Sequence, residues 1–122
     1  IKPEDVDYIN THGTSTPLGD IAEVLAIKRT FGEHAYKLSV NATKSMTGHL
    51  LGAAGALECM ASVLSIKHGI VPPTINHFNL DPKVDPKIDF TFDKAKERDI
   101  NIALCNNFGF GGHNVTIVIK KI

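Results

Sequence analysis

The 122-residue chain has no tryptophan, only two cysteines and no excess of either charge. Thirteen basic residues balance thirteen acidic ones, so the electrostatic attraction that drives nucleic-acid or anionic-membrane binding is missing. Two cysteines are too few for a disulfide scaffold, which favours a reducing compartment. No apolar run approaches the roughly 20 residues of a membrane helix, and nothing at the N-terminus resembles a signal peptide. We therefore expect neither a nucleic-acid nor a membrane partner.

The composition that is present suits one globular domain with a modest core, at 43% hydrophobic and 21% charged residues. Short apolar runs alternate with longer helical patterns, which predicts an α/β fold. The predicted elements are strands at 6–10 and 37–41, helices at 21–31 and 52–68, a loop at 42–51, a short strand at 88–92 and a turn at 93–99.

Each predicted helix carries one apolar stripe that we expect to face the core. In the first helix the stripe ends in a lysine that contributes only its stem. The two stripes are Ile21, Val24, Leu25 and Lys28 in the first helix, and Leu57, Met60, Ala61 and Leu64 in the second.

The C-terminal third predicts an antiparallel hairpin. Its strands are Ile102–Asn106 and Val115–Lys120, with a long glycine-rich connection between them. Three consecutive apolar residues at 117–119 predict strands that are buried on both faces. Before the hairpin, residues 70–86 hold four of the six prolines and predict an extended, ordered excursion over the surface.

Three polar loops with glycine, at 10–16, 41–49 and 106–112, each follow a predicted strand. Sites in α/β sheets lie in the crevice at the carboxyl ends of the strands. The loops are therefore expected to converge and to bring together His12, Lys44, His49 and the backbone of 108–112.

Simpler interpretations of these residues stay open on the residues alone. A loop histidine is most often exposed and without function, a loop lysine is most often solvated, and the glycine stretch suits a hairpin turn. Cys59 and Cys105 suit small core residues. The glycine loops lack the spacing of phosphate or dinucleotide cradles, and no two histidines stand at a zinc-ligand spacing.

Together, the three loops resemble the C-terminal signature of β-ketoacyl-[acyl carrier protein] synthases of the elongating type II class. The similar motifs are Thr11-His-Gly-Thr-Ser-Thr-Pro17, Asn41-Ala-Thr-Lys-Ser-Met-Thr-Gly-His49 with Leu50-Leu-Gly-Ala-Ala-Gly55, and Asn107-Phe-Gly-Phe-Gly-Gly112. The resemblance covers residues 1–122 in order. It implies part of the C-terminal half of a thiolase-like α/β fold, a mixed sheet with helices packed on it.

The resemblance also implies decarboxylative Claisen condensation of malonyl-acyl carrier protein with an acyl thioester in fatty-acid elongation. His12 and His49 match the two catalytic histidines, which donate N–H bonds to the enolate. Lys44 matches the active-site lysine, paired in that family with an acid that matches Glu23. Phe110 matches the gating phenylalanine whose backbone N–H contributes to an oxyanion hole.

Substrate binding is implied for four further residues. Thr14 and Thr16 match the hydroxyls that bind the phosphopantetheine arm, and Phe108 and Gly109 belong to the gating loop. The arm arrives on the acyl carrier protein, so no resident organic cofactor is expected. Some members of the family enclose a monovalent cation between four residues. The alternative is that the same four residues form a hydrogen-bonded cluster. The matching residues are Asn10, Glu58, Asn107 and Asn114.

The chain departs from the family pattern because it has no Ala-Cys-Ser elbow for the nucleophilic cysteine. It also begins at Ile1 rather than methionine, so we expect the last portion of a synthase, inactive alone. The implied partners are the acyl carrier protein, the missing N-terminal half and a second copy in a homodimer. The implied location is the cytoplasm, or an organelle if a targeting segment has been removed.

Two other interpretations remain from the sequence. One is a free-standing small chain that binds acyl carrier protein or a complementary half without catalysis. The other is a ketosynthase domain of a modular polyketide synthase. Those domains usually carry a shorter Lys-Ser-Asn-Ile-Gly-His motif, whereas Thr43-Lys-Ser-Met-Thr-Gly-His49 is of the fatty-acid kind.

Overall fold

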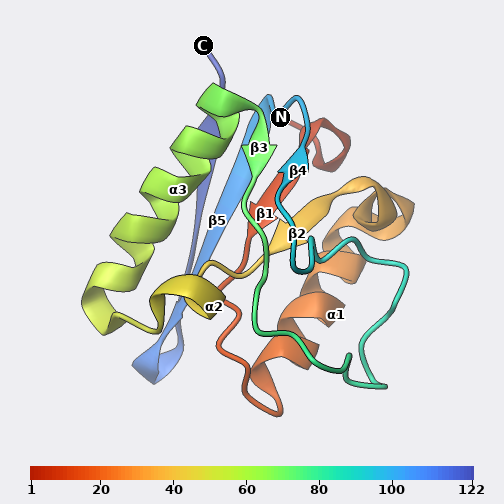
Figure 1. The fold of residues 1–122 in the computed structure, drawn as a ribbon, viewed down its shortest axis with the longest axis vertical. Coiled ribbons are helices and arrows are strands. Elements are labelled where there is room, and N and C mark those ends of the chain that lie inside the picture. Colours follow the sequence, from red (N-terminus) through yellow and green to blue (C-terminus); the bar gives the residue numbers. More distant parts are fainter.

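The main sheet has four strands in the order β2-β1-β5-β6 in the computed structural model, which describes residues 1–122. β1 is parallel to both β2 and β5, and β6 closes an antiparallel hairpin with β5 (Figure 1). The strands of this sheet are β1 (Tyr8–Asn10), β2 (Ser39–Asn41), β5 (Ile102–Gly109) and β6 (His113–Lys120). The sheet is therefore mixed, as predicted.

The α-helices are α1 (Gly19–Phe31), α2 (Lys44–Thr47) and α3 (Ala54–His68). A second, two-stranded sheet pairs β3 (Ile70–Val71) with β4 (Lys96–Glu97). Short 3-10 helices cover Pro3–Asp5, Gly32–Lys37, Leu51–Ala53 and Phe110–Gly112. The predicted loop at 42–51 thus contains one helical turn, and the predicted turn at 93–99 contains β4.

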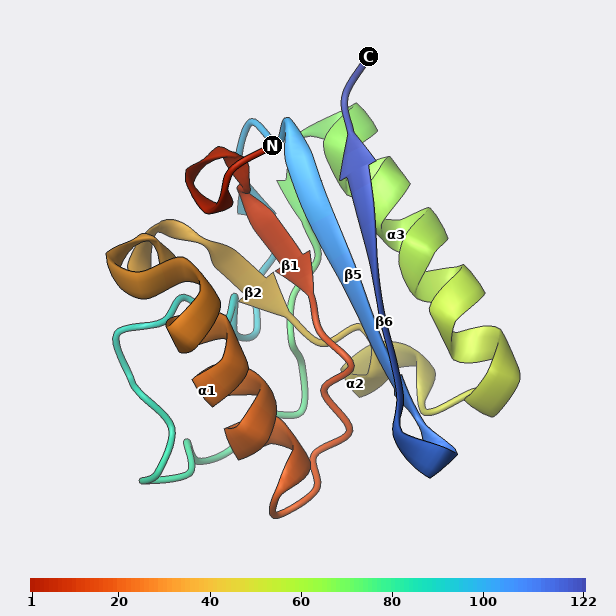
Figure 2. The same cartoon turned by 180° about the vertical axis from the view of Figure 1, so that it is seen from behind.

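The two long helices cover opposite faces of the sheet, because successive strand residues point to opposite sides. Ile9 packs in a cluster with Val24 and Ile27 of α1. Tyr8 packs in a second cluster with Ile66 of α3. The view from behind shows α1 and α3 on either side of the sheet (Figure 2). The protein therefore has three layers: α1, the sheet and α3. The polar loops leave the carboxyl ends of the parallel strands, between the two helices.

The predicted stripe of α3 is wrong. Met60 is 57% exposed and Leu64 52% exposed, whereas Glu58 and Ser62 are fully buried. This polar face is tolerated because its side chains find partners, with the Ser62 hydroxyl donating to the Glu58 carbonyl at 2.8 Å. In α1, Val24 is buried as the predicted stripe requires, whereas Leu25 is 49% exposed.

The hairpin is confirmed, but its connection is only Phe110–Gly112 rather than the long one predicted. The prediction that its apolar run is buried on both faces is also wrong. Ile117 is 44% exposed and Val118 is 48% exposed. The physical reason is position, because β6 lies at the edge of the sheet and pairs only with β5. Residues 70–86 run mostly outside the sheets, as predicted, but they begin with β3, and Val71 and Val84 are buried. Residues 88–92 form only isolated bridges, at Asp89 and Phe92, in place of the predicted strand.

Parallel pairing brings the three polar loops to one edge of the sheet. β1, β2 and β5 run in the same direction, so residues 11–16, residues 42–49 and the turn Phe110–Gly112 all leave the same end. Their convergence, predicted from the sequence, is therefore confirmed. No helix in the structure combines the length and apolarity needed to cross a lipid bilayer.

Gly13 occupies a position that excludes any side chain. Its φ is +39°, and a Cβ there would lie 2.6 Å from the Ala42 Cβ and 2.7 Å from the Thr11 Oγ1. We expect Gly13→Ala to lower the free energy of unfolding of the full-length protein by about 1–3 kcal/mol, through backbone strain and this clash. Denaturant unfolding followed by circular dichroism measures the loss.

Gly52→Ala is the matched control, since a Cβ at Gly52 meets nothing within 4 Å and its φ is not left-handed. We expect it to leave the unfolding free energy unchanged. Equal stability of the two variants would contradict the close approach of the loops after β1 and β2.

Candidate active site

His12 is held by a buried carboxylate behind its loop. The backbone N–H groups of His12 and Gly13 donate to the two Glu23 oxygens, both at 3.0 Å. The Asn106 side-chain amide donates to the same carboxylate at 3.1 Å. Burial raises the pKa of Glu23, and these hydrogen bonds oppose the rise. Glu23 therefore ties the loop after β1 to α1 and β5.

The partner of Lys44 is Glu58, so the predicted pairing with Glu23 is wrong. The Lys44 ammonium and the Glu58 carboxylate form an ion pair whose side chains are only 4% and 1% exposed. Asn107 donates to the second Glu58 oxygen at 2.9 Å. Glu23 is already occupied by the His12 loop. The sequence could have indicated Glu58 as a buried acid, because it lies on the same face of α3 as the small residues Ala54 and Ser62.

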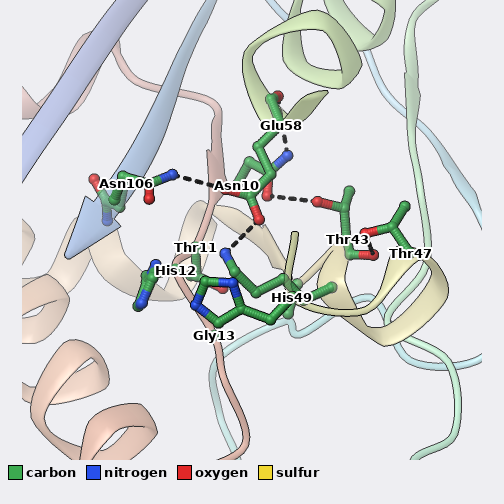
Figure 3. A network of polar contacts seen from close by, with 12 residues as sticks. Asn10, Thr11, His12, Gly13, Thr43, Thr47, His49, Glu58 and Asn106 are labelled. Atoms are coloured by element: carbon green, nitrogen blue, oxygen red, sulfur yellow. Dashed lines mark hydrogen bonds and ion pairs between the residues drawn. The ribbon is translucent and has the colours of Figure 1, made fainter. Parts of the chain in front are cut away.

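The two candidate histidines lie against each other. The ring centroids of His12 and His49 are 5.5 Å apart with an edge-to-face angle of 85°, and Phe108 lies 5.5 Å from His12 on another side. The Nδ1 of His49 accepts the Leu51 backbone N–H at 3.0 Å. A neutral His49 therefore carries its proton on Nε2, which is free to donate. Figure 3 shows both rings close to the polar network around Asn10.

His12 is neutral at physiological pH. Burial, the Lys44 charge and His49 lower the pKa of His12 to about 4. Its Nδ1 is buried and has no protein partner. The neutral His12 and the adjacent His49, beside one buried ammonium, form a set of N–H donors suited to an oxygen atom that gains negative charge.

Two cavities meet at His49 and at the loop after β1. One, of about 660 Å³, is lined by His12, His49, Phe108, Gly109 and Phe110. The other, of about 890 Å³, passes Lys44 and residues 74–78. Thr14, Thr16 and His49 line both, and the two threonine hydroxyls lie 3.1 Å apart.

Phe110 lies at the mouth of the smaller cavity and is 94% exposed. It begins the short turn Phe110–Gly112, in which Gly111 has a φ of +79° and Gly112 a φ of +82°. Only glycine adopts such angles without strain, so this turn depends on both residues. The structure places Phe110 beside the histidines while leaving its ring free of packing.

The four residues implied for a monovalent cation do not fit one in this arrangement. Both Glu58 oxygens already accept bonds, and the Lys44 ammonium would repel a second cation. The Asn10 amide donates to the Glu58 carbonyl at 3.2 Å and its oxygen accepts from Thr43. Asn114 is exposed and lies opposite Phe108 in the hairpin. The structure therefore shows a hydrogen-bonded cluster of Asn10, Glu58 and Asn107 without Asn114, and Lys44 supplies its positive charge.

Neither cysteine is placed as a nucleophile. Cys105 is buried within β5, and burial together with the nearby Glu58 charge raises its thiol pKa to about 11. Cys59 lies half-buried within α3, away from any helix N-terminus. The interpretation of Cys105 as a core residue is confirmed.

The sequence matches the model of the β-ketoacyl synthase C-terminal domain over residues 1–78. It is 57% identical, over 122 residues, to 3-oxoacyl-[acyl-carrier-protein] synthase 2 of Coxiella burnetii. It is 52% identical, over 121 residues, to the protein of the same name from Synechocystis. These matches cover 100% and 99% of this chain, and it spans 29% of the length of each relative.

Solved ketosynthase structures have the same fold. One is a type II polyketide ketosynthase in complex with its acyl-carrier protein, at a TM-score of 0.95 and 40% identity. Another is a β-ketoacyl synthase from Burkholderia phymatum, at a TM-score of 0.92 and 36% identity. Both matches cover 100% of this chain and 29% of the solved one. The thiolase-like fold that the resemblance implied is therefore confirmed.

The lowered pKa of His12 is testable by titration. In full-length protein labelled with ¹³C-histidine, we expect the His12 signal to keep its neutral position from pH 8 down to about pH 5 and to move only near pH 4. In Lys44→Met combined with Glu58→Gln, which removes both charges of the ion pair, the pKa of His12 should rise toward 6.5. A wild-type midpoint near 6.5 would contradict the lowered pKa of His12.

Proposed function

Because the chain belongs to the β-ketoacyl synthase C-terminal domain family, we propose that its full-length protein catalyses decarboxylative Claisen condensation in fatty-acid elongation. The substrates are malonyl-acyl carrier protein and an acyl thioester. The single observation that carries the proposal is the contact of two imidazoles, His12 and His49, beside the buried ammonium of Lys44. In this scheme the chain supplies the decarboxylation machinery.

Decarboxylation is the step that needs the histidine pair. The bond between the α-carbon and the carboxylate breaks, CO₂ leaves, and the electron pair passes into an enolate on the thioester. The ring N–H groups of His12 and His49 donate to the enolate oxygen, and each such donor is typically worth roughly 10²–10³ in rate. The charge of Lys44, which is paired with Glu58, helps hold His12 neutral.

Condensation follows when the enolate carbon attacks the acyl thioester. The acyl group is held on a cysteine outside these 122 residues, since Cys105 is buried with a raised thiol pKa. The new C–C bond forms, the C–S bond breaks, and the thiolate leaves. The backbone N–H of Phe110 stabilises the oxyanion of the acyl group, and the glycines after it let the turn open and close.

The phosphopantetheine arm enters along the two cavities that Thr14 and Thr16 line. Their hydroxyls bond the arm's amides, and binding of this remote part positions the reacting carbon. The likeness to a ketosynthase solved with its acyl-carrier protein supports this partner. A homodimer and a cytoplasmic location complete the proposal.

The sequence identities to known synthases support a fatty-acid rather than a polyketide substrate. Identity is 52–57% to synthases named for acyl-carrier-protein-bound 3-oxoacyl products. It falls to 40% for the type II polyketide ketosynthase and to 26–30% for ketosynthases of the bacillaene polyketide synthase. The similarity thus favours the elongating type II class.

His49→Ala tests the proposal in the full-length protein. We expect it to abolish CO₂ release from malonyl-acyl carrier protein, because one of two enolate donors is lost, while the cysteine is still acylated. His68→Ala, at the exposed end of α3, is the matched control and should retain the wild-type rate. Normal CO₂ release by His49→Ala would overturn the role of the histidine pair.

Lys44→Ala tests whether the lysine acts in decarboxylation and not in acylation of the cysteine. We expect it to slow CO₂ release strongly, since it removes the charge next to His12 and leaves Glu58 unpaired. Acylation of the cysteine should be largely spared. Rates of CO₂ release and of acyl-enzyme formation, measured by radiolabel and by mass spectrometry, show the split; equal losses in both steps would contradict it.

A further inference from the structure

The proline-rich segment after β3 is bonded to the helical turn that carries Lys44. We call residues 72–76 the strap; Figure 1 shows it passing beside α2. The Ile75 backbone N–H donates to the Ser45 hydroxyl oxygen at 3.0 Å, and the Asn76 side chain donates to the Ser45 carbonyl at 3.0 Å. The Ala42 backbone N–H donates to the Thr74 hydroxyl oxygen at 3.1 Å. The strap thus contacts α2 through both side-chain and backbone groups.

The turn needs such outside support. α2 has four residues, and a helix of one turn is unstable by itself because nucleation costs more than its few bonds return. On one side the Lys44 side chain ties α2 to α3 through Glu58. On the other side the strap bonds Ser45, the next residue along. α2 is therefore held between α3 and the strap.

The strap is itself fixed on its far side. The Thr74 hydroxyl donates to the Phe90 carbonyl at 3.0 Å, and the Thr74 N–H donates to the Thr91 carbonyl at 2.9 Å. Asn41 donates to the Pro72 carbonyl at 2.9 Å. Asn76 has a φ of +59°, a conformation that asparagine tolerates better than most residues. The strap can therefore act as a rigid support.

We infer that Thr74 and Asn76 are positioning residues that set where α2 presents Lys44 and His49. This inference rests on the proposed function. It concerns decarboxylation alone, because Lys44 and His49 lie on or directly after α2, whereas Phe110 lies on the β5–β6 hairpin. A displacement of about 1 Å in a catalytic group can cost about 10²-fold in rate. Loosening the strap therefore slows CO₂ release and leaves acylation intact.

Asn76→Asp is the main test in the full-length protein. It keeps the size of the side chain but replaces the donor with a carboxylate that faces the Ser45 carbonyl. We expect kcat for CO₂ release from malonyl-acyl carrier protein to fall about tenfold, with KM and the acylation rate within about twofold of wild type. Asn101→Asp, the same change at an exposed residue that lines neither of the two cavities and has no bond to Ser45, should leave all three values unchanged.

Thr74 supplies a second pair of variants. Thr74→Val removes the hydroxyl at constant shape and should reproduce the selective loss, and Thr74→Ser restores the hydroxyl and should restore kcat. If Thr74→Val does not fold, the exposed Asn76→Asp still decides the question. An unchanged kcat in Asn76→Asp, or equal losses in CO₂ release and acylation, would overturn the inference.

A readout without activity separates this inference from the proposed function. Hydrogen exchange of the Thr47 and Gly48 amides reports the backbone bonds that close α2, at 3.1 and 2.9 Å. We expect faster exchange of both amides in Asn76→Asp and no change in Asn101→Asp. Unchanged exchange overturns the strap's role, whereas a wild-type protein that releases no CO₂ overturns the proposed function and leaves the exchange result valid.

Discussion

The buried ion pair between Lys44 and Glu58 is the interaction on which the site depends. Two charges out of contact with water are costly, and only close pairing and further hydrogen bonds offset that cost. Here Asn107 bonds the second oxygen of Glu58, and the backbone carbonyl of Glu58 accepts from Asn10. The pair therefore joins α2, α3, β1 and β5 at one point. Any movement of one element would leave a buried charge without its partner.

A second buried carboxylate, that of Glu23, supports the site from the opposite face of the sheet. Glu23 on α1 accepts the backbone N–H groups of His12 and Gly13 together with the amide of Asn106. One acid thus fixes the loop that carries His12, and the other fixes the lysine that helps keep His12 uncharged. The two acids therefore have separate tasks. The strap adds a third support, on the outer side of α2.

The sequence predicts the parts of this structure that depend on local signals. The hairpin, the excursion at 70–86 and the convergence of three loops follow from turn residues, prolines and the direction of parallel strands. The partner of Lys44 could not be predicted in this way, because Glu58 reaches it through the packing of α3 on the sheet. The same packing buries Ser62 and exposes Met60, against the apolar pattern. The exposure of Ile117 follows from the edge position of β6, which a single strand's composition does not reveal.

A double-mutant cycle on the ion pair tests this account most directly. The melting temperatures of full-length Lys44→Met, Glu58→Gln and the double variant would be compared with wild type by calorimetry. Each single change removes one partner of a buried pair, which typically costs about 3–5 kcal/mol. The account predicts that the double variant melts well above the temperature expected from adding the two losses. Additive losses would show that Lys44 and Glu58 do not support each other, and would contradict the central role given to the pair.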